Sequence, residues 1–189
     1  MVLGTFAYCG SGQDTLADGF CKYLGFTKYC MGDIIREFAS ARKLPLQRKI
    51  LQNIRVEINS KYGRNFVPES IVERINKAEK PTNNVIITGI RTIEECSILR
   101  GELGMKLIFV YADENIRYLR MLKRKDEKDE ENLSELKKRM ERENEMFDYV
   151  QLQEQALYKF DFNMPLDVYK IIEKNIVQKI YVEMMEKGY

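Results

Sequence analysis

Apolar runs that alternate with helical patterns restrict the fold of this sequence more than any other feature. Five such runs predict strands, at residues 2–8, 26–33, 84–91, 105–113 and 157–164. The run NVIITGIR is dense in β-branched residues, which is typical of a strand buried on both faces. Strands that alternate with helices indicate an α/β protein with a mainly parallel sheet between two layers of helices. We therefore expect a three-layer α/β/α fold.

Helical periodicity predicts helices between and after these strands. Ile50, Ile54 and Ile58, for example, recur at four-residue intervals and would share one helical face. Asp33 is placed to cap the helix that follows the second strand. With 44% hydrophobic residues, the chain is expected to form a single domain over residues 1–189. The predicted helices lie at residues 15–24, 33–43, 46–61, 68–80, 92–103, 114–124 and 166–186.

Residues 123–145 carry a high density of charge of both signs. Acidic and basic residues recur there at helical spacing, which predicts a solvated helical element. Pairs four residues apart, such as Glu135 with Arg139, would account for part of this charge as ordinary surface ion pairs. Acids from Asp126 to Glu131 interrupt any basic stripe, and the net charge of the chain is only +2. Nucleic acid is therefore not an expected partner.

Composition excludes several kinds of chemistry. The chain contains no histidine, which excludes a histidine base, a histidine phosphate carrier and histidine metal ligands. Its four cysteines form no CxxC pair, and a disulfide between Cys21 and Cys30 is less expected than free thiols. The chain shows no charged leader followed by a long apolar segment, and no run of the roughly 18 apolar residues that a membrane span needs. A reducing, cytoplasmic setting is the simplest expectation.

A glycine-rich turn, CGSGQDT, follows the first predicted strand and precedes a helix. Such a turn lets backbone N–H groups converge on an anion, and the next helix adds the positive end of its dipole. The usual pattern is G-x-x-x-x-G-K-[ST], from which Ala7, Gln13 and Asp14 depart. Taken alone, the segment is equally consistent with a tight strand–helix turn that binds nothing. The candidate phosphate-binding residues are Gly10, Ser11, Gly12, Gln13, Asp14 and Thr15.

Two further turns, at residues 30–36 and 88–92, also follow predicted strands. The carboxyl ends of parallel strands meet at one edge of a sheet, and ligands bind there. Arg36 and Arg91 lie within these turns, and the guanidinium fork matches the oxygens of a phosphate. The three turns are therefore expected to form one site.

The loop resembles that of the nucleoside monophosphate kinases, adenylate-kinase-like proteins whose loop ends GSGKGT. MGDIIRE, at 31–37, is similar to their GD-x-x-R element, which opens the helix that holds the acceptor phosphate. ITGIRT, at 87–92, looks like their DG-x-x-R stretch, and the basic run at 117–142 resembles their arginine-bearing lid. An adenylate-kinase-related nucleotide kinase group that reads MGD-x-IRE and DGIR is the nearest match. These elements follow the family's order over nearly the whole chain.

The resemblance implies a Mg²⁺ ion bound with ATP or another nucleoside triphosphate, with Thr15 and Asp14 on the metal side. It implies acceptor-binding helices at about 33–80, where Asp33, Arg36 and Arg91 would hold a small phosphorylated acceptor. An arginine-bearing lid at about 117–145 would close over the transferring phosphoryl group. The candidate catalytic residues are then Gln13, Arg91, Arg120, Arg124, Arg139 and Arg142.

Three positions depart from the family's pattern. Gln13 replaces the loop lysine and carries no charge, while Thr88 replaces the strand-end acid that orients magnesium through water. Asp14 adds a negative charge beside the phosphate site. Two functions therefore remain open. One is a kinase that transfers a phosphoryl group from a nucleoside triphosphate to a nucleotide-like monophosphate. The other is a catalytically degenerate nucleotide-binding module that acts as a sensor or partner protein.

Overall fold

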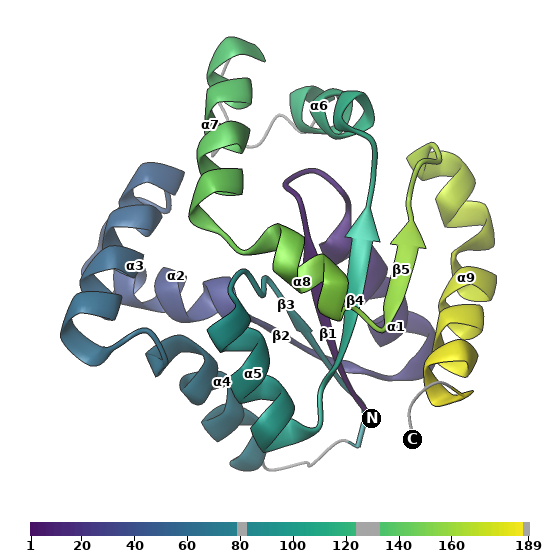
Figure 1. The fold of residues 1–189 in the computed structure, drawn as a ribbon, viewed down its shortest axis with the longest axis horizontal. Helices are drawn as coiled ribbons and strands as arrows, with labels where there is room; N and C mark the ends of the chain where they lie inside the picture. Colours follow the sequence, from purple (N-terminus) through teal and green to yellow (C-terminus); the bar gives the residue numbers. More distant parts are fainter. Residues whose placement is uncertain (79–82, 124–132, 187–189) are drawn as a thin grey trace.

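A parallel sheet forms the centre of the molecule in the computed structural model, which describes residues 1–78, 83–123 and 133–186. The strands lie in the order β2-β3-β1-β4-β5, and every pairing is parallel. Figure 1 shows the sheet with helices on both sides, so the predicted three-layer α/β/α fold is confirmed. The strands are β1 (Val2–Ala7), β2 (Thr27–Cys30), β3 (Val85–Thr88), β4 (Lys106–Tyr111) and β5 (Tyr158–Asp161).

The described helices form the outer layers and a raised part above the carboxyl ends of the strands (Figure 1). Helices α1 and α9 cover one face of the sheet, and α2, α4, α5 and α8 cover the other. Their bounds are α1 (Gln13–Leu24), α2 (Met31–Ala41), α3 (Arg48–Tyr62), α4 (Phe66–Asn76), α5 (Ile93–Leu103), α6 (Glu114–Lys123), α7 (Leu133–Met146), α8 (Tyr149–Gln155) and α9 (Leu166–Glu186).

Each face of the sheet supports its own hydrophobic core. Phe6, Ile87 and Phe109 are fully buried on the face that α2, α4, α5 and α8 cover. The rings of Phe6 and Phe109 stack with their centroids 4.7 Å apart. Leu3 and Ile108 are fully buried on the opposite face, against α1 and α9. Because successive side chains of a strand point to opposite faces, both cores are built from the same buried runs.

The raised part consists of α6 and α7, which lie in the region where the sequence predicted a helical lid. Tyr118 and Met121 from α6 pack with Met140 from α7 in a small apolar cluster, which also contacts Cys9. The charged segment expected to be helical over 123–145 is helical in α7, and residues 124–132 lie outside the described part. Helices α6 and α7 therefore contact the turn that follows β1 through this cluster.

Several expected boundaries shift in the structure. The helix after β2 begins at Met31 rather than at residue 33, because no connecting residue separates it from the strand. Cys30 is its N-cap, so the prediction that Asp33 caps this helix is wrong. Asp33 lies inside the first turn, where its carboxylate accepts a hydrogen bond from Arg36. The short helix α8 was not predicted.

No disulfide joins Cys21 to Cys30 or any other two cysteines of residues 1–78, 83–123 and 133–186. In the described parts of the chain, no helix combines the length and the apolar character that crossing a bilayer requires.

The stacked aromatic pair gives a test of the core. We expect Phe6→Ala to lower the free energy of unfolding by about 3–5 kcal/mol, because it leaves a cavity beside Phe109. Val56 on α3 is 63% exposed, so the control Val56→Ala should change stability by less than about 0.5 kcal/mol. Urea unfolding followed by circular dichroism measures both variants. Equal losses would contradict the burial of Phe6.

Candidate functional site

The turns after β1, β2 and β3 leave the sheet at the same edge, as the sequence predicted. This follows from the parallel pairing of the three strands. The turn after β3 also contacts the start of α2: a Cβ atom on Gly89 would lie 3.6 Å from the Cβ of Met31. The segments expected to bind the nucleotide and the acceptor are therefore neighbours.

The loop after β1 is held in a tight conformation. The backbone N–H of Ser11 donates to the carbonyl oxygen of Tyr8 at 3.1 Å, and Gly12 has a φ of +97°. A Cβ atom on Gly12 would lie 2.6 Å from the ring of Phe162, so glycine is needed for both backbone conformation and space. Gly12 is the N-cap of α1 and makes no side-chain cap. The first amides of α1 are thus suited to an anion.

Three side-chain oxygens are buried without a hydrogen-bond partner among the described residues: Ser11 Oγ in the loop, Gln13 Oε1 at the start of α1 and Thr88 Oγ1 at the end of β3. Ser11 and Thr88 are fully buried, and Thr88 pairs with Thr5 in the adjacent strand β1. Buried polar groups in folded proteins nearly always have a partner. Hydroxyl groups donate readily to phosphate oxygens, so the residues present fit a phosphate ligand.

Arg120 joins the loop to the far edge of the sheet. Its Nη1 donates to the carbonyl oxygen of Ser11 at 3.1 Å, and its Nη2 donates to those of Phe162 and Met164 at 2.7 and 2.9 Å. The guanidinium also lies over the Phe162 ring, 4.4 Å from its centroid. Burial lowers the pKa of Arg120. The side chain of Arg120, one of the predicted lid arginines, therefore contacts the backbone of the loop.

Two further arginines, which the sequence did not single out, contact the loop. Arg117 of α6 is 8% exposed, and its Nη1 donates to the carbonyl oxygen of Cys9 at 3.4 Å. Arg48, the first residue of α3, donates to Glu143 of α7 at 2.9 Å and lies 4.0 Å from the sulfur of Cys9. Neither contact has a local signal in the sequence, because the partners are far apart along the chain.

Asp14 makes an ion pair rather than standing alone beside the loop. Its Oδ1 lies 3.8 Å from Nζ of Lys28, which also donates to Asp18 at 2.6 Å. Burial acts to lower the pKa of Lys28, but the hydrogen bond to Asp18 and the charge of Asp14 outweigh it and raise that pKa. The negative charge of Asp14 is thus partly neutralised. Thr15 lies in the same first turn of α1.

Arg36 is folded back onto its own helix. Its Nε and Nη2 donate to Oδ1 of Asp33 at 3.0 and 2.5 Å, and Nη2 lies 3.3 Å from the sulfur of Cys30. Burial opposes the charge of the guanidinium, yet the hydrogen bond to Asp33 outweighs it and raises the pKa of Arg36. The structure brings these two candidate acceptor residues together at the carboxyl end of β2.

Arg91 lies in a turn that a buried carboxylate organises. Glu95 is 2% exposed, and its Oε2 accepts from the backbone N–H groups of Arg91 and Thr92 at 2.8 and 3.3 Å. Its other oxygen forms an ion pair with Arg55 of α3. Thr92 and Glu95 also form a capping box at the start of α5. The acid thus holds the turn after β3 rigidly against α3.

The side chain of Arg91 stacks on an aromatic group. Its guanidinium carbon lies 4.8 Å from the centroid of the Phe147 ring, and its carbonyl oxygen accepts from the N–H of Asp148 at 3.1 Å. Tyr149, next along the chain, lies edge-on to Tyr8 of the loop with centroids 4.8 Å apart. Burial raises the pKa of Tyr149, so its phenol stays neutral near pH 7. The segment 147–149 therefore links the first and third turns.

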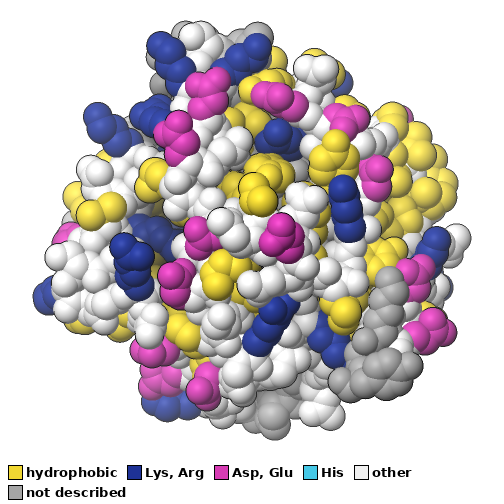
Figure 2. Space-filling view, viewed as in Figure 1, with side chains coloured by type: hydrophobic (Ala, Val, Ile, Leu, Met, Phe, Trp, Pro, Cys, Tyr) yellow, Lys and Arg dark blue, Asp and Glu magenta, His cyan; other side chains and the backbone are white. Residues whose placement is uncertain are grey.

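The other candidate lid arginines lie farther from the loop or outside the described residues. Arg142 is exposed on α7, and its Nε donates to the carbonyl oxygen of Lys138 at 3.2 Å. Arg124 lies outside the described part of the chain, as does the side chain of Arg139 and with it the expected pair with Glu135. Figure 2 shows Lys and Arg side chains gathered around α7 and the neighbouring end of α3, with acidic side chains between them.

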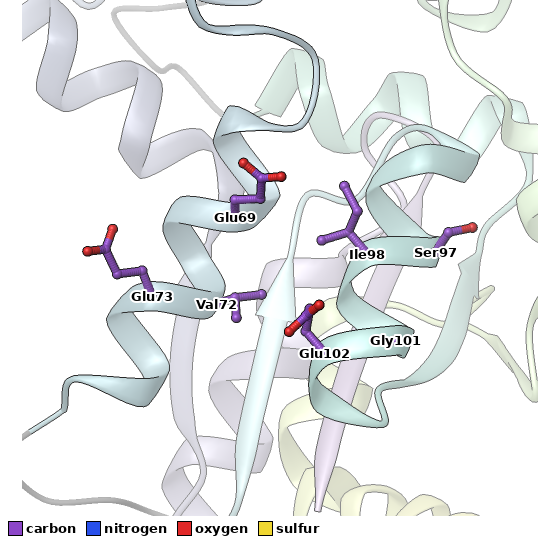
Figure 3. Close-up of a pocket in the computed structure, with 7 residues that line it drawn as sticks. All are labelled: Glu69, Val72, Glu73, Ser97, Ile98, Gly101 and Glu102. Carbon is purple, nitrogen blue, oxygen red and sulfur yellow. The ribbon is translucent and has the colours of Figure 1, made fainter.

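A separate open cavity of about 480 Å³ lies between α4 and α5 (Figure 3). Its lining includes the carboxylates of Glu69, Glu73 and Glu102. Glu73 also pairs with Lys77 of its own helix. This negative lining does not suit a phosphate, so the cavity is not part of the candidate site.

The fold and the loop define the class of protein. A family model described as an AAA domain (AAA_17) matches residues 7–137, and the chain belongs to this family. The chain also belongs to the UPF0200 proteins. It is 31% identical over 144 residues to a UPF0200 protein of Methanothermobacter thermautotrophicus, covering 76% of this chain and 72% of that protein. It is 24% identical over 177 residues to one of Thermococcus onnurineus, covering 92% and 95%.

The solved structures to which the chain is similar include small-molecule kinases. The chain is similar to a shikimate kinase from Bacteroides thetaiotaomicron, with a TM-score of 0.64, 15% identity and 98% coverage of both chains. It is also similar to a gluconokinase from Sinorhizobium meliloti, with a TM-score of 0.58, 13% identity, and coverage of 100% of this chain and 97% of that one. At these identities the likeness shows a P-loop kinase-like fold.

Two glycines give a matched test of the loop. We expect Gly12→Ala to lower the free energy of unfolding by about 1–3 kcal/mol, because of its positive φ and the contact with Phe162. Gly101 in α5 has nothing within 4 Å of the added Cβ, so Gly101→Ala should raise stability by about 0.5–1 kcal/mol. Chemical unfolding of both variants gives the comparison. A stable Gly12→Ala protein would show that the loop is looser than described.

Proposed function

We propose that this chain binds a nucleoside triphosphate at residues 10–15 and transfers its terminal phosphoryl group to a small phosphorylated acceptor of the nucleotide monophosphate type. The main observation behind this proposal is the glycine loop. The hydroxyl oxygens of Ser11 and Thr88 are buried and have no hydrogen-bond partner among the described residues. The P-loop kinase-like fold supports the same reading. Phosphoryl transfer depends on positioning and charge neutralisation, which a loop and arginines can supply without histidine.

The acceptor would bind beside the loop, at the turns after β2 and β3. Arg36 and Arg91 have guanidinium groups there, and Arg91 is held by the rigid turn around Glu95. The ion pair of Arg36 with Asp33 is partly exposed, so exchanging the carboxylate for a phosphate costs little. The resemblance to nucleoside monophosphate kinases favours a monophosphate over an uncharged acceptor.

Magnesium would be held on the nucleotide side by Thr15 and Asp14 in the first turn of α1. No cluster of three acidic, cysteine or histidine side chains occurs in residues 1–78, 83–123 and 133–186. Mg²⁺ at phosphate sites keeps several waters and uses only one or two protein ligands, so this donor set is sufficient. When bound, the ion would neutralise charge on the phosphate oxygens.

Nucleotide binding and turnover test the proposal together. Calorimetry with a non-hydrolysable ATP analogue and Mg²⁺ should show binding. Incubation with ATP, Mg²⁺ and a panel of nucleoside monophosphates should give a diphosphate product, detected by chromatography. Shikimate and gluconate, the substrates implied by the names of the similar structures, belong in the panel as comparison acceptors. The absence of both binding and turnover would overturn the proposal.

The second candidate function is a nucleotide-binding module without catalysis. Gln13 favours it, because the uncharged side chain stands where the loop lysine is expected. Binding without turnover across the panel, together with turnover gained by Gln13→Lys, would support this candidate. Loss of one preorganised contact to the transition state typically costs about 10²- to 10³-fold in rate, which is the size of the gain to look for.

The acceptor role of Arg91 gives a separate prediction. We expect Arg91→Gln to raise the KM for the monophosphate by about 10- to 100-fold, because a charge-assisted contact is lost. The Kd for the ATP analogue should stay close to that of the wild type. Lys174, exposed on α9 and outside the segment 33–80 expected to bind the acceptor, provides the control Lys174→Gln. A KM unchanged by Arg91→Gln would remove Arg91 from the acceptor site.

A further inference from the structure

Arg117 is a buried cation that contacts the phosphate loop and has unused donor capacity. Its Nη1 donates to the carbonyl oxygen of Cys9, and its guanidinium carbon lies 5.1 Å from the centroid of the Tyr8 ring. Its Nε is buried and has no hydrogen-bond partner among the described residues. A buried donor without an acceptor costs stability, so the arrangement is typical of a group that meets an anionic ligand.

The fold places Arg117 at the loop through a rigid connection. Strand β4 pairs directly with β1, and Ala7 at the end of β1 is in register with Val110. Helix α6 begins at Glu114, so Arg117 lies in its first turn. A Cβ atom on Gly10 would lie only 2.9 Å from the carbonyl oxygen of Arg117. The arginine therefore has a defined position relative to the loop even without a ligand.

Four other arginines near the three turns have partners for their charge or their donors, whereas Arg91 stacks on Phe147. Arg120 donates to three carbonyl oxygens. No carboxylate forms an ion pair with Arg117 within the parts of the chain that the structure describes. Arg36, Arg48 and Arg55 form ion pairs with carboxylates, which belong to Asp33, Glu143 and Glu95 respectively.

We infer that Arg117 supplies the positive charge that Gln13 lacks, by donating hydrogen bonds to terminal phosphate oxygens of the bound nucleoside triphosphate. The inference rests on the proposed function, because it requires a nucleotide in the loop. Guanidinium carries five N–H donors and stays charged, so the bond to Cys9 leaves others for the phosphate. Arg117 neutralises charge on the oxygens and takes no part in making or breaking bonds. The cation thus comes from α6 instead of the loop.

Four variants test the inference by calorimetry with the ATP analogue and Mg²⁺. Arg117→Gln removes the charge, and Arg117→Lys keeps it. The double variant Arg117→Gln with Gln13→Lys moves the charge to the usual loop position. Arg64→Gln, an exposed arginine away from the three turns, is the control.

We expect Arg117→Gln to weaken binding of the analogue by about 10- to 100-fold, as for the loss of a charged hydrogen bond. Arg117→Lys and the double variant should recover affinity, and Arg64→Gln should match the wild type. The affinity for the monophosphate of the same nucleoside should be unchanged by Arg117→Gln, because Arg117 acts on the terminal phosphates. A purely structural role would weaken both ligands equally.

The outcomes separate this inference from the proposed function. If the wild type binds no nucleotide, the proposed function and this inference both fail. If the wild type binds and Arg117→Gln binds equally well, only this inference fails. Equal weakening for triphosphate and monophosphate, or a double variant that recovers nothing, also overturns it.

A second measurement does not depend on the folding of Arg117→Gln. The Nε–H resonance of Arg117 in ¹⁵N-arginine-labelled wild-type protein is identified by its absence from the Arg117→Lys spectrum. We expect this resonance to shift when the ATP analogue is added. A resonance that stays in place while the loop amides of residues 10–15 shift would overturn the inference.

Discussion

Close contact between a glycine loop and two distant segments is the constraint on which the site depends. Gly10 lies against the backbone of Arg117, and Gly12 lies against the ring of Phe162. Any side chain at either glycine would separate the loop from α6 or from the turn after β5. Because both contacts are short, the loop amides, the buried hydroxyl of Ser11 and the start of α1 are held in one arrangement. The loop is therefore preorganised by packing.

Charge at this edge of the sheet is balanced by internal pairing. The partly exposed pair of Arg36 with Asp33 contributes little to stability and is suited to exchange with an anionic ligand. The pair of Arg48 with Glu143 is more buried, and it ties α3 to the lid helix α7. Arg117 differs because its charge has no such partner among the described residues. Among the described residues, the edge thus combines arginines paired with carboxylates and arginines without such a partner, of which Arg117 is one.

Much of the architecture was predictable because it rests on local patterns. All five strands and the shared edge of the three turns were predicted correctly from apolar runs and parallel-sheet geometry. The start of the second helix was predicted wrongly, because Met31 continues directly from β2 and makes Cys30 the N-cap in place of Asp33. Helix α8 was missed because its seven residues are too few to show a period. The roles of the candidate site residues stay predictions.

The sequence by itself determined the alternation of strands and helices, the glycine loop at residues 10–15 and the absence of histidine chemistry. Only the tertiary structure decided which charges reach that loop. Arg117 and Cys9 are 108 residues apart, and Arg48 and Glu143 are 95 apart. Periodicity reports the few residues around each position, whereas these contacts depend on strand order and on how α6 and α7 pack above the sheet. For that reason the arginines that contact the loop backbone, Arg117 and Arg120, come from α6 and not from the loop itself.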